Sequence, residues 1–150
     1  MLGFLTIVIS RFGFHHFIDY DNVFDEMIRV CKSGGTVMVV DVALPEDKLE
    51  AYDTMEKLRD PSHVGALSLS KFDELFQTNK LVNYRKTSYE MAIELENQLN
   101  ASFPDPAARG KLKSMIVGDA GINSLGVNVT LADEKYQLYY PVQVCVGQKK

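Results

Sequence analysis

The chain has 150 residues, a length that corresponds to a single domain. Its 16 basic and 20 acidic residues give a net charge of −4 at pH 7. A mildly acidic chain has no long-range attraction to nucleic acid or to an anionic membrane, so we expect neither as a partner. Hydrophobic residues make up 46% of the chain, which is typical of a globular protein and excludes a mostly disordered one. The two cysteines, Cys31 and Cys145, are too few for a disulfide framework and favour a reducing, cytoplasmic compartment.

The first ten residues, MLGFLTIVIS, are strongly apolar but lack the features of a targeting segment. No Lys or Arg precedes the apolar run, as a signal peptide requires, and Arg11 interrupts it well before the about 20 apolar residues that a membrane helix needs. The β-branched residues within 4–10 predict instead a strand that is buried on both faces.

A strand–helix–strand unit is predicted next. A loop with an aromatic and histidine cluster occupies 13–20, and Asp21 is expected to cap a helix over 22–32. Ser33-Gly34-Gly35 is expected to end that helix, because Gly readily takes the left-handed conformation of a helix C-terminus. The nearly unbroken apolar run at 36–44 predicts a central parallel strand, and the crossover should be right-handed.

The rest of the chain predicts further helices and strands, with no repeat and no change of composition that would mark a second domain. In chain order we expect a helix from Pro45 to Leu58, a turn at 60–63, a short helix opened by Ser70, a strand at 81–89, a helix at 91–99, a helix from Asp105 to Gly118, a loop at 119–126, and strands at 130–131 and 138–146.

Three stretches together resemble one protein family. They are SRFGFHHF at 10–17, EMIRVCKSGG at 26–35 and VVD at 39–41. In this order and spacing they resemble the second half of a class I S-adenosylmethionine (SAM)-dependent methyltransferase, of the branch that includes the ubiquinone/menaquinone C-methyltransferases. LRDPSH at 58–63 resembles a motif of one bacterial subgroup of that branch. The resemblance covers residues 4–80 by motif and the remainder only by architecture.

The resemblance implies an α/β fold with a partial Rossmann-like sheet. The family sheet has the strand order 3-2-1-4-5-7-6 with the seventh strand antiparallel. Residues 4–10, 36–44, 81–89 and 138–147 match strands four, five, six and seven. The helices between the last two would form an insertion over the mouth of the active site. Residues 1–150 would then be one domain, the C-terminal half of the fold, without the N-terminal strands that bind SAM.

This interpretation leaves the chain with about half of a SAM site. The family holds SAM with a glycine-rich turn and with an acidic residue on the ribose hydroxyls, and no G-x-G occurs in the chain. Gly34-Gly35 is expected to end a helix rather than to begin one, so this pair cannot cradle the cofactor. We therefore expect the chain by itself to be inactive and unable to bind SAM normally, whereas its full-length relative would methylate a small organic acceptor.

By position in the family, Ser10, Arg11 and Phe12 would lie nearest the cofactor, and His15 and His16 nearest the substrate. Either histidine could be a general base, because an imidazole titrates near neutral pH. Many methyl transfers need only alignment of the reactants, so a base is not obligatory. The loop could also be purely structural, with its phenylalanines anchored in the core.

Asp41, Asp60 and His63 are the remaining candidates, all on the substrate side. Asp41 would either face the cleft or hydrogen-bond a neighbouring loop. Asp60 and His63, beside Arg59, would form a substrate-side loop or a capped turn with a surface ion pair.

A metal site is not expected, because adjacent histidines point in different directions and no ligand set has the required spacing. Three tyrosines are typical of a core or an interface rather than of a ligand site: Tyr136, Tyr139 and Tyr140.

The strand at 4–10 would lack a neighbour on one side. No Lys or Pro between Phe4 and Ile9 protects that edge from pairing with another chain. We therefore expect a homodimer in which two such edges pair antiparallel across a two-fold axis.

Two alternative interpretations of the whole chain stay open. The chain could be a non-catalytic interaction module derived from a methyltransferase fold, or an unrelated small α/β protein.

Overall fold

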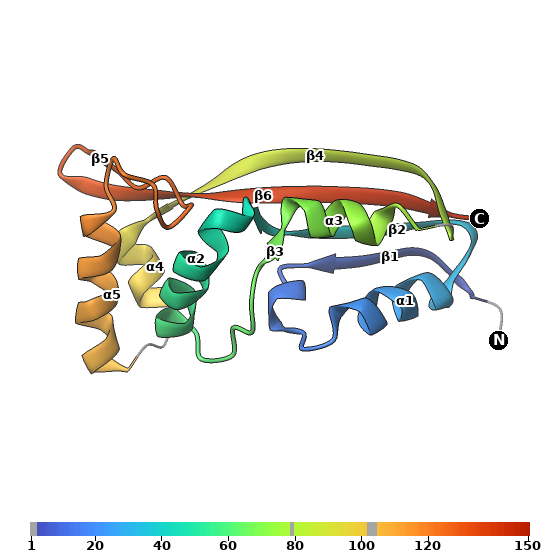
Figure 1. Ribbon diagram of the computed structural model, residues 1–150, viewed down its shortest axis with the longest axis horizontal. Coiled ribbons are helices and arrows are strands. Elements are labelled where there is room, and N and C mark those ends of the chain that lie inside the picture. The colour runs from blue at the N-terminus through green and yellow to red at the C-terminus, as the bar shows by residue number, and fades with distance from the viewer. Residues whose placement is uncertain (1–2, 79, 102–104) are drawn as a thin grey trace.

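The computed structural model describes residues 3–78, 80–101 and 105–150. Its strands form an open sheet in the order β1-β2-β6-β4, to which β3 and β5 add short pairings with β2 and β6 (Figure 1). The elements in chain order are β1 (Leu5–Arg11), the 3-10 helix η1 (Phe14–His16), α1 (Tyr20–Val30), β2 (Cys31–Leu44), α2 (Glu46–Arg59), β3 (Leu67–Ser68), α3 (Leu69–Phe76), β4 (Leu81–Glu94), α4 (Leu95–Ala101), α5 (Pro106–Gly118), β5 (Thr130–Ala132) and β6 (Lys135–Lys149).

The sheet has the topology that the family resemblance implies. β1 and β2 are parallel, with Ile9 opposite Met38, and α1 connects them. β6 runs antiparallel to both β2 and β4. The order β1-β2-β6-β4 therefore corresponds to family strands four, five, seven and six, and it confirms the predicted α/β class.

The start of the strand–helix–strand unit differs from the prediction in two ways. The N-cap of α1 is Asp19, not Asp21, because the Asp19 side chain accepts a hydrogen bond from the Asn22 backbone N–H. The helix ends at Val30, before the glycines, and Gly34 and Gly35 lie in an irregular stretch of β2. There the register with β1 jumps from Cys31 to Thr36. A Cβ at Gly35 would lie 2.6 Å from Sγ of Cys31, so the glycines permit a close turn of the strand rather than a helix end.

The predicted helix at 91–99 is wrong in its first half. β4 continues to Glu94, and α4 begins only at Leu95. Residues 91–94 extend the strand because they pair with the unusually long β6, as Ile93 does with Leu138. Tertiary pairing here overrides a helical pattern. α4 and α5 confirm that the connection between β4 and β6 contains helices, and Figure 1 shows them with α2 at one end of the molecule.

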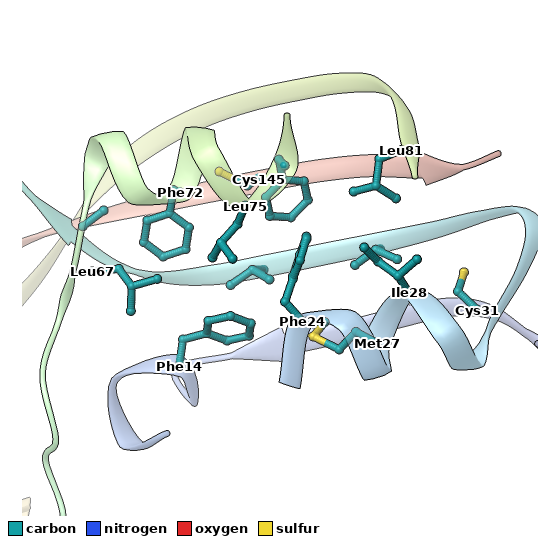
Figure 2. Close-up of a cluster of buried hydrophobic side chains, with 14 residues drawn as sticks. Phe14, Phe24, Met27, Ile28, Cys31, Leu67, Phe72, Leu75, Leu81 and Cys145 are labelled. Carbon is teal, nitrogen blue, oxygen red and sulfur yellow. The ribbon is translucent and has the colours of Figure 1, made fainter. Parts of the chain in front are cut away.

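The core consists of two clusters. In the first, η1, α1 and α3 pack on one face of the sheet through aromatic and aliphatic side chains, among them Phe14, Phe24 and Phe72, all at most 3% exposed (Figure 2). The second joins α2, α4 and α5 to the ends of β2 and β6. Cys31 and Cys145 are both buried in the first cluster as free thiols. None of the helices in the described part of the chain is long and apolar enough to cross a membrane.

β1 is an edge strand, and the prediction that it is buried on both faces is wrong. Val8 packs against the first core cluster, but Ile7 and Ile9 are 57% and 56% exposed. The reason is geometric, since successive side chains of a strand point to opposite faces and α1 covers only one of them. Phe4, just before the strand, is also exposed.

Candidate functional site

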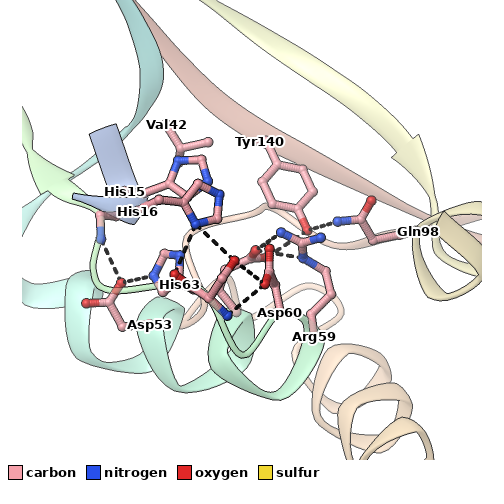
Figure 3. Close-up of polar contacts among 12 residues, drawn as sticks. His15, His16, Val42, Asp53, Arg59, Asp60, His63, Gln98 and Tyr140 are labelled. Carbon is pink, nitrogen blue, oxygen red and sulfur yellow. Dashed lines mark hydrogen bonds and ion pairs between the residues drawn. The ribbon is translucent and has the colours of Figure 1, made fainter. Parts of the chain in front are cut away.

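The candidate site lies where the carboxyl ends of β1 and β2 meet the loop that follows α2. The chain has three histidines, and the fold brings all of them together here (Figure 3). The ring centroids of His15 and His16 are 4.1 Å apart, and those of His15 and His63 are 5.5 Å apart. η1 carries the first two, and the α2–β3 loop carries the third.

His15 is paired with the buried carboxylate of Asp41. Nδ1 of His15 lies 2.7 Å from Oδ1 of Asp41, whose side chain is 1% exposed. The other carboxylate oxygen accepts a 2.8 Å hydrogen bond from the Phe14 backbone N–H. Asp41 therefore hydrogen-bonds the neighbouring η1, which was one of the two predicted possibilities. Its position near the carboxyl end of β2 is what allows it to reach this loop.

His16 and Asp60 meet through Ser62. Nδ1 of His16 lies 3.0 Å from the Ser62 carbonyl oxygen and 3.2 Å from its hydroxyl. The Ser62 hydroxyl donates to Oδ1 of Asp60 at 2.6 Å, and the Ser62 backbone N–H donates to the same atom at 2.8 Å. The hydroxyl bond is the main reason that the pKa of Asp60 is lowered, and Arg59 contributes less. Asp60 thus caps the turn, in agreement with the capped-turn interpretation.

His63 is held by Asp53, a residue that the sequence analysis did not single out. Nε2 of His63 lies 2.7 Å from Oδ1 of Asp53, which also accepts a hydrogen bond from the Ala66 backbone N–H. The ring stacks on His15 and its edge meets Tyr52. Nδ1 of His63 is buried and has no hydrogen-bond partner among the described residues. In the described part of the chain, it is the one buried polar side-chain atom without a hydrogen-bond partner.

A second polar cluster, which we call the Glu56 network, lies beside the histidines. Arg59 donates from Nε to the buried carboxylate of Glu56 at 2.7 Å, so the predicted surface ion pair of Arg59 is instead a contact with a buried partner. The Tyr140 hydroxyl donates to Glu56 and accepts from Gln98. Burial, and then the charge of Glu56, raise the pKa of Tyr140 well above its usual value. Tyr140 is therefore a core residue, as one of the two interpretations of the tyrosines held.

Arg11 and Phe12 sit at the end of β1 in an unusual conformation. The Arg11 guanidinium lies over the Phe12 ring, 4.5 Å from its centroid. Phe12 has a φ of 52°, although its backbone N–H still donates to the Val40 carbonyl at 2.8 Å. A positive φ is costly for an aromatic residue and recurs at binding and catalytic sites. Ser10 precedes them on the same strand.

These residues fit one part of SAM and not the whole of it. Arg11 is an exposed guanidinium that can pair with a carboxylate, such as that of the amino acid end of SAM, and the Phe12 ring offers an apolar surface next to it. β1 itself carries no acidic residue that could hold ribose hydroxyls. Asp41 is already engaged with η1. Within the described residues, no group of three or more His, Cys, Asp or Glu side chains is placed to hold a metal ion.

The sequence analysis missed Asp53, Ser62, Glu56 and Gln98. Asp53 lies ten residues before His63, and only the fold of the intervening turn brings the two together. A signal did exist in DPSH at 60–63, because Asp followed two residues later by Ser commonly forms an Asx turn. Gln98 and Tyr140 come from elements far apart in the chain, so no local pattern links them.

Comparison with known proteins shows that the chain is similar to methyltransferases. Residues 3–75 match the model of the ubiE/COQ5 methyltransferase family. An uncharacterised methyltransferase of Bacillus subtilis (strain 168), YcgJ, is 33% identical over 107 residues, which is 70% of this chain and 42% of YcgJ. The uncharacterised protein YafE of Escherichia coli (strain K12) is 42% identical over 60 residues, or 39% of this chain and 29% of YafE. The aligned part of the chain thus covers less than half the length of either relative.

Solved structures extend the similarity to the whole fold. The YcgJ crystal structure matches 97% of this chain and 64% of its own, with a TM-score of 0.84 and 24% identity. The phosphoethanolamine N-methyltransferase 2 of Haemonchus contortus, in complex with SAM, matches 97% of this chain and 33% of its own, with a TM-score of 0.54 and 14% identity. At these identities the matches show the fold alone. They confirm the partial methyltransferase sheet inferred from the sequence.

Proposed function

We propose that the chain takes part in SAM-dependent methyl transfer to a small organic acceptor. The match of residues 3–75 to the ubiE/COQ5 methyltransferase family model and the fold that nearly the whole chain shares with YcgJ support this proposal. The observation that carries the proposal is the convergence of His15, Asp41, Asp60 and His63 at the carboxyl ends of β1 and β2. In open α/β sheets this is the edge at which ligands bind.

The cofactor side of the site is assigned to Ser10, Arg11 and Phe12. SAM carries a carboxylate and a methyl group on a sulfonium, and when bound it provides the methyl group for transfer. We assign the exposed guanidinium of Arg11 to the carboxylate, held in position by its contact with the Phe12 ring. The acceptor would lie on the other side of η1, towards the histidines.

SAM binding tests this function directly. Labelled SAM is dialysed to equilibrium against the longest natural polypeptide that contains these 150 residues, and against the 150-residue chain alone. We expect one SAM per longest polypeptide and weak binding to the 150 residues alone, because the latter lack a glycine-rich turn. Arg11→Ala should weaken binding about tenfold, the loss of one charge-assisted hydrogen bond.

The matched control is Arg85→Ala, because Arg85 is exposed on β4 and lies outside the candidate site. Binding to the longest polypeptide should be the same with and without this substitution. If SAM bound neither to the longest polypeptide nor to the 150-residue chain, the proposed function would be overturned. Equal weakening by the two substitutions would overturn the assignment of Arg11.

A second candidate function, an interaction module, rests on a separate observation, the exposed edge of β1. The Phe12 backbone N–H donates to Val40 on β2, and the Phe4 N–H donates to Val30, the last residue of α1 before β2. N–H and C=O groups alternate in direction along a strand. Those of Leu5, Ile7, Ile9 and Arg11 therefore point away from the sheet, where no described strand pairs with them. We propose that the isolated chain forms a homodimer by antiparallel pairing of this edge.

Sedimentation velocity of the 150-residue chain at micromolar concentration tests the homodimer. We expect a dimer that Ile9→Lys converts to a monomer, because a charge on the edge opposes strand pairing. Ile122→Lys is the matched control, since Ile122 is 70% exposed in a loop outside β1. A wild-type chain that sediments as a monomer would count against the interaction module.

A further inference from the structure

The partners of the three imidazoles determine which ring nitrogen of each carries the hydrogen. A carboxylate or a carbonyl oxygen only accepts hydrogen bonds, so the ring nitrogen facing it must donate. Nδ1 of His15 faces Asp41, Nδ1 of His16 faces the Ser62 carbonyl, and Nε2 of His63 faces Asp53. In the neutral rings the lone pairs are therefore on Nε2 of His15, Nε2 of His16 and Nδ1 of His63.

Only one of these lone pairs combines access with a charged partner. The His63 side chain is 1% exposed, so its lone pair is out of reach of a ligand from solution. His16 is accessible, but its partner at Nδ1 is a neutral carbonyl. His15 is 14% exposed and faces the carboxylate of Asp41. A carboxylate stabilises the imidazolium that forms when the opposite nitrogen takes up a proton.

The His15 ring is also fixed from several sides. Asp41 accepts hydrogen bonds from the backbone N–H groups of Phe14 and Val42, both at 2.8 Å, so the carboxylate cannot turn away. The His15 carbonyl accepts from the Val64 and Gly65 N–H groups at 2.9 and 3.2 Å, which ties η1 to the α2–β3 loop. The stacked ring of His63, anchored by Asp53, covers His15. A ring held in this way needs little reorganisation to accept a proton.

We propose that the Asp41–His15 pair is the proton acceptor of the methyl transfer, and that the methyl acceptor is therefore protic, with an O–H, N–H or acidic C–H at the atom that is methylated. This inference rests on the proposed function. The bond from that atom to hydrogen breaks, and the proton moves to Nε2 of His15. The electron pair left behind forms the bond to the methyl carbon while the carbon–sulfur bond of the sulfonium donor breaks, its pair remaining on sulfur. Asp53 and His63 are positioning residues that act through His15.

The first test needs no cofactor and uses the 150-residue chain. Long-range ¹H–¹⁵N NMR spectra of the imidazoles report the tautomer of each ring. We expect His15 as the tautomer protonated on Nδ1, and a mixture of both tautomers in Asp41→Asn. Asp21→Asn on the surface of α1 is the matched control, because Asp21 is exposed and lies outside the cluster, and it should leave the His15 signals unchanged. A wild-type His15 protonated on Nε2 would overturn the proposal.

The second test measures transfer of labelled methyl groups by the longest natural polypeptide that contains the chain. The acceptors are catechol, a primary alkylamine and a 1,3-dicarbonyl compound as the protic set, and dimethyl sulfide as the aprotic one. We expect label only in the protic set, and a rate that Asp41→Asn lowers by about 10²-fold or more, within the usual contribution of a general base. Asp53→Asn should lower the rate less than Asp41→Asn does. It should also broaden the NMR signals of the His15 ring, whereas a purely structural role of Asp53 would not confine the change to this ring.

The outcomes separate this inference from the proposed function. If SAM does not bind, the proposed function itself fails. If SAM binds with the same affinity in wild type and Asp41→Asn, and the substitution lowers the rate of methyl transfer to the protic acceptors, the proton acceptor is supported. Label in dimethyl sulfide, no label in any protic acceptor, or a rate that Asp41→Asn leaves unchanged would overturn the proton acceptor while leaving SAM binding intact.

Discussion

At the scale of single residues, the turn at 60–63 shows how one hydroxyl controls a carboxyl group. The Ser62 hydroxyl and backbone N–H both donate to Oδ1 of Asp60, and the hydroxyl is the larger cause of the lowered Asp60 pKa. Hydrogen bonds to a carboxylate favour its charged form. The same hydroxyl lies against His16, so the turn links a charge to the histidine cluster.

Ser62→Ala should therefore raise the pKa of Asp60 towards its usual value, because one of its two donors is lost. A lowered pKa in the folded state stabilises the fold above the pKa of the unfolded chain, and this contribution is lost as the pH falls through the folded value. Because Asp60 is only partly buried, the change in stability should be small. Titration of the Asp60 carboxyl carbon by NMR measures the shift, with Ser114→Ala on the exposed face of α5 as the control. An Asp60 pKa that stays lowered would contradict this explanation.

Individual residues were predictable where a motif contained them. The resemblance picked out His15, Asp41, Asp60 and His63, and the fold gathers them in one cluster. It could not supply their pairing. Asp53 takes its role from a turn that reverses the chain between α2 and β3, and the chain carries many other surface acids of the same appearance.

At the scale of secondary-structure elements, the Glu56 network joins helices to the sheet. Tyr140 on β6 contacts Glu56 on α2 and Gln98 on α4 through one hydroxyl. All three residues are at most 8% exposed. A buried polar group that loses its partner costs more than an exposed one, because water does not replace the bond. The network therefore fixes how α2 and α4 sit on the end of the sheet.

We expect Tyr140→Phe to lower the free energy of unfolding by about 1–3 kcal/mol, since it removes a bond from both Glu56 and Gln98. Urea unfolding followed by circular dichroism measures the change. Tyr139→Phe is the matched control, because the neighbouring Tyr139 is only half-buried and faces away from this cluster; it should change stability by less than about 0.5 kcal/mol. Equal losses in both variants would show that the hydroxyl of Tyr140 has no special role.

The main elements were predictable in order, less so in their ends, and neither η1 nor β3 was predicted. Apolar periodicity located α3 and the C-terminal end of β2 closely, because each buries its own apolar side chains, but β2 begins five residues before the predicted strand. The boundary at 91–94 failed because Ile93 is drawn into β4 by Leu138, a partner more than 40 residues away along the chain. The glycines at 34–35 look like a helix end, yet they serve the close contact with Cys31. Long-range contacts of this kind leave no trace in a local pattern.

At the scale of the whole molecule, both the β1 edge and one face of the sheet lack a cover within the described residues. Val37 and Val39 point into the first core cluster, so their neighbours Met38 and Val40 point to the opposite face. Strand pairing places these two residues beside apolar residues of the neighbouring strands, and together they form two apolar rows across that face. The rows are Ile9–Met38–Val146 and Val40–Val144. Of these residues Val40 is buried and the other four are half-buried or exposed. A second copy paired only through β1 would cover the edge and leave this face open.

A partner that supplies both a strand and a covering layer would satisfy the edge and the face together. We expect such a partner in the part of YcgJ that this chain does not cover, because the two folds superpose over 97% of this chain but only 64% of YcgJ. Co-expressed with that part, the 150-residue chain should form a 1:1 complex in place of the homodimer.

Met38→Lys should weaken the complex about tenfold or more, since burial of one such side chain contributes about 1.5–3 kcal/mol. It should leave the edge-paired homodimer largely intact, because Met38 is not on the edge strand. Isothermal titration gives the affinity and sedimentation gives the stoichiometry, with Ile122→Lys as the control for an added surface charge. A homodimer that persists in the presence of the YcgJ part would mean that the β1 edge prefers its own copy and that the open face has no role in assembly.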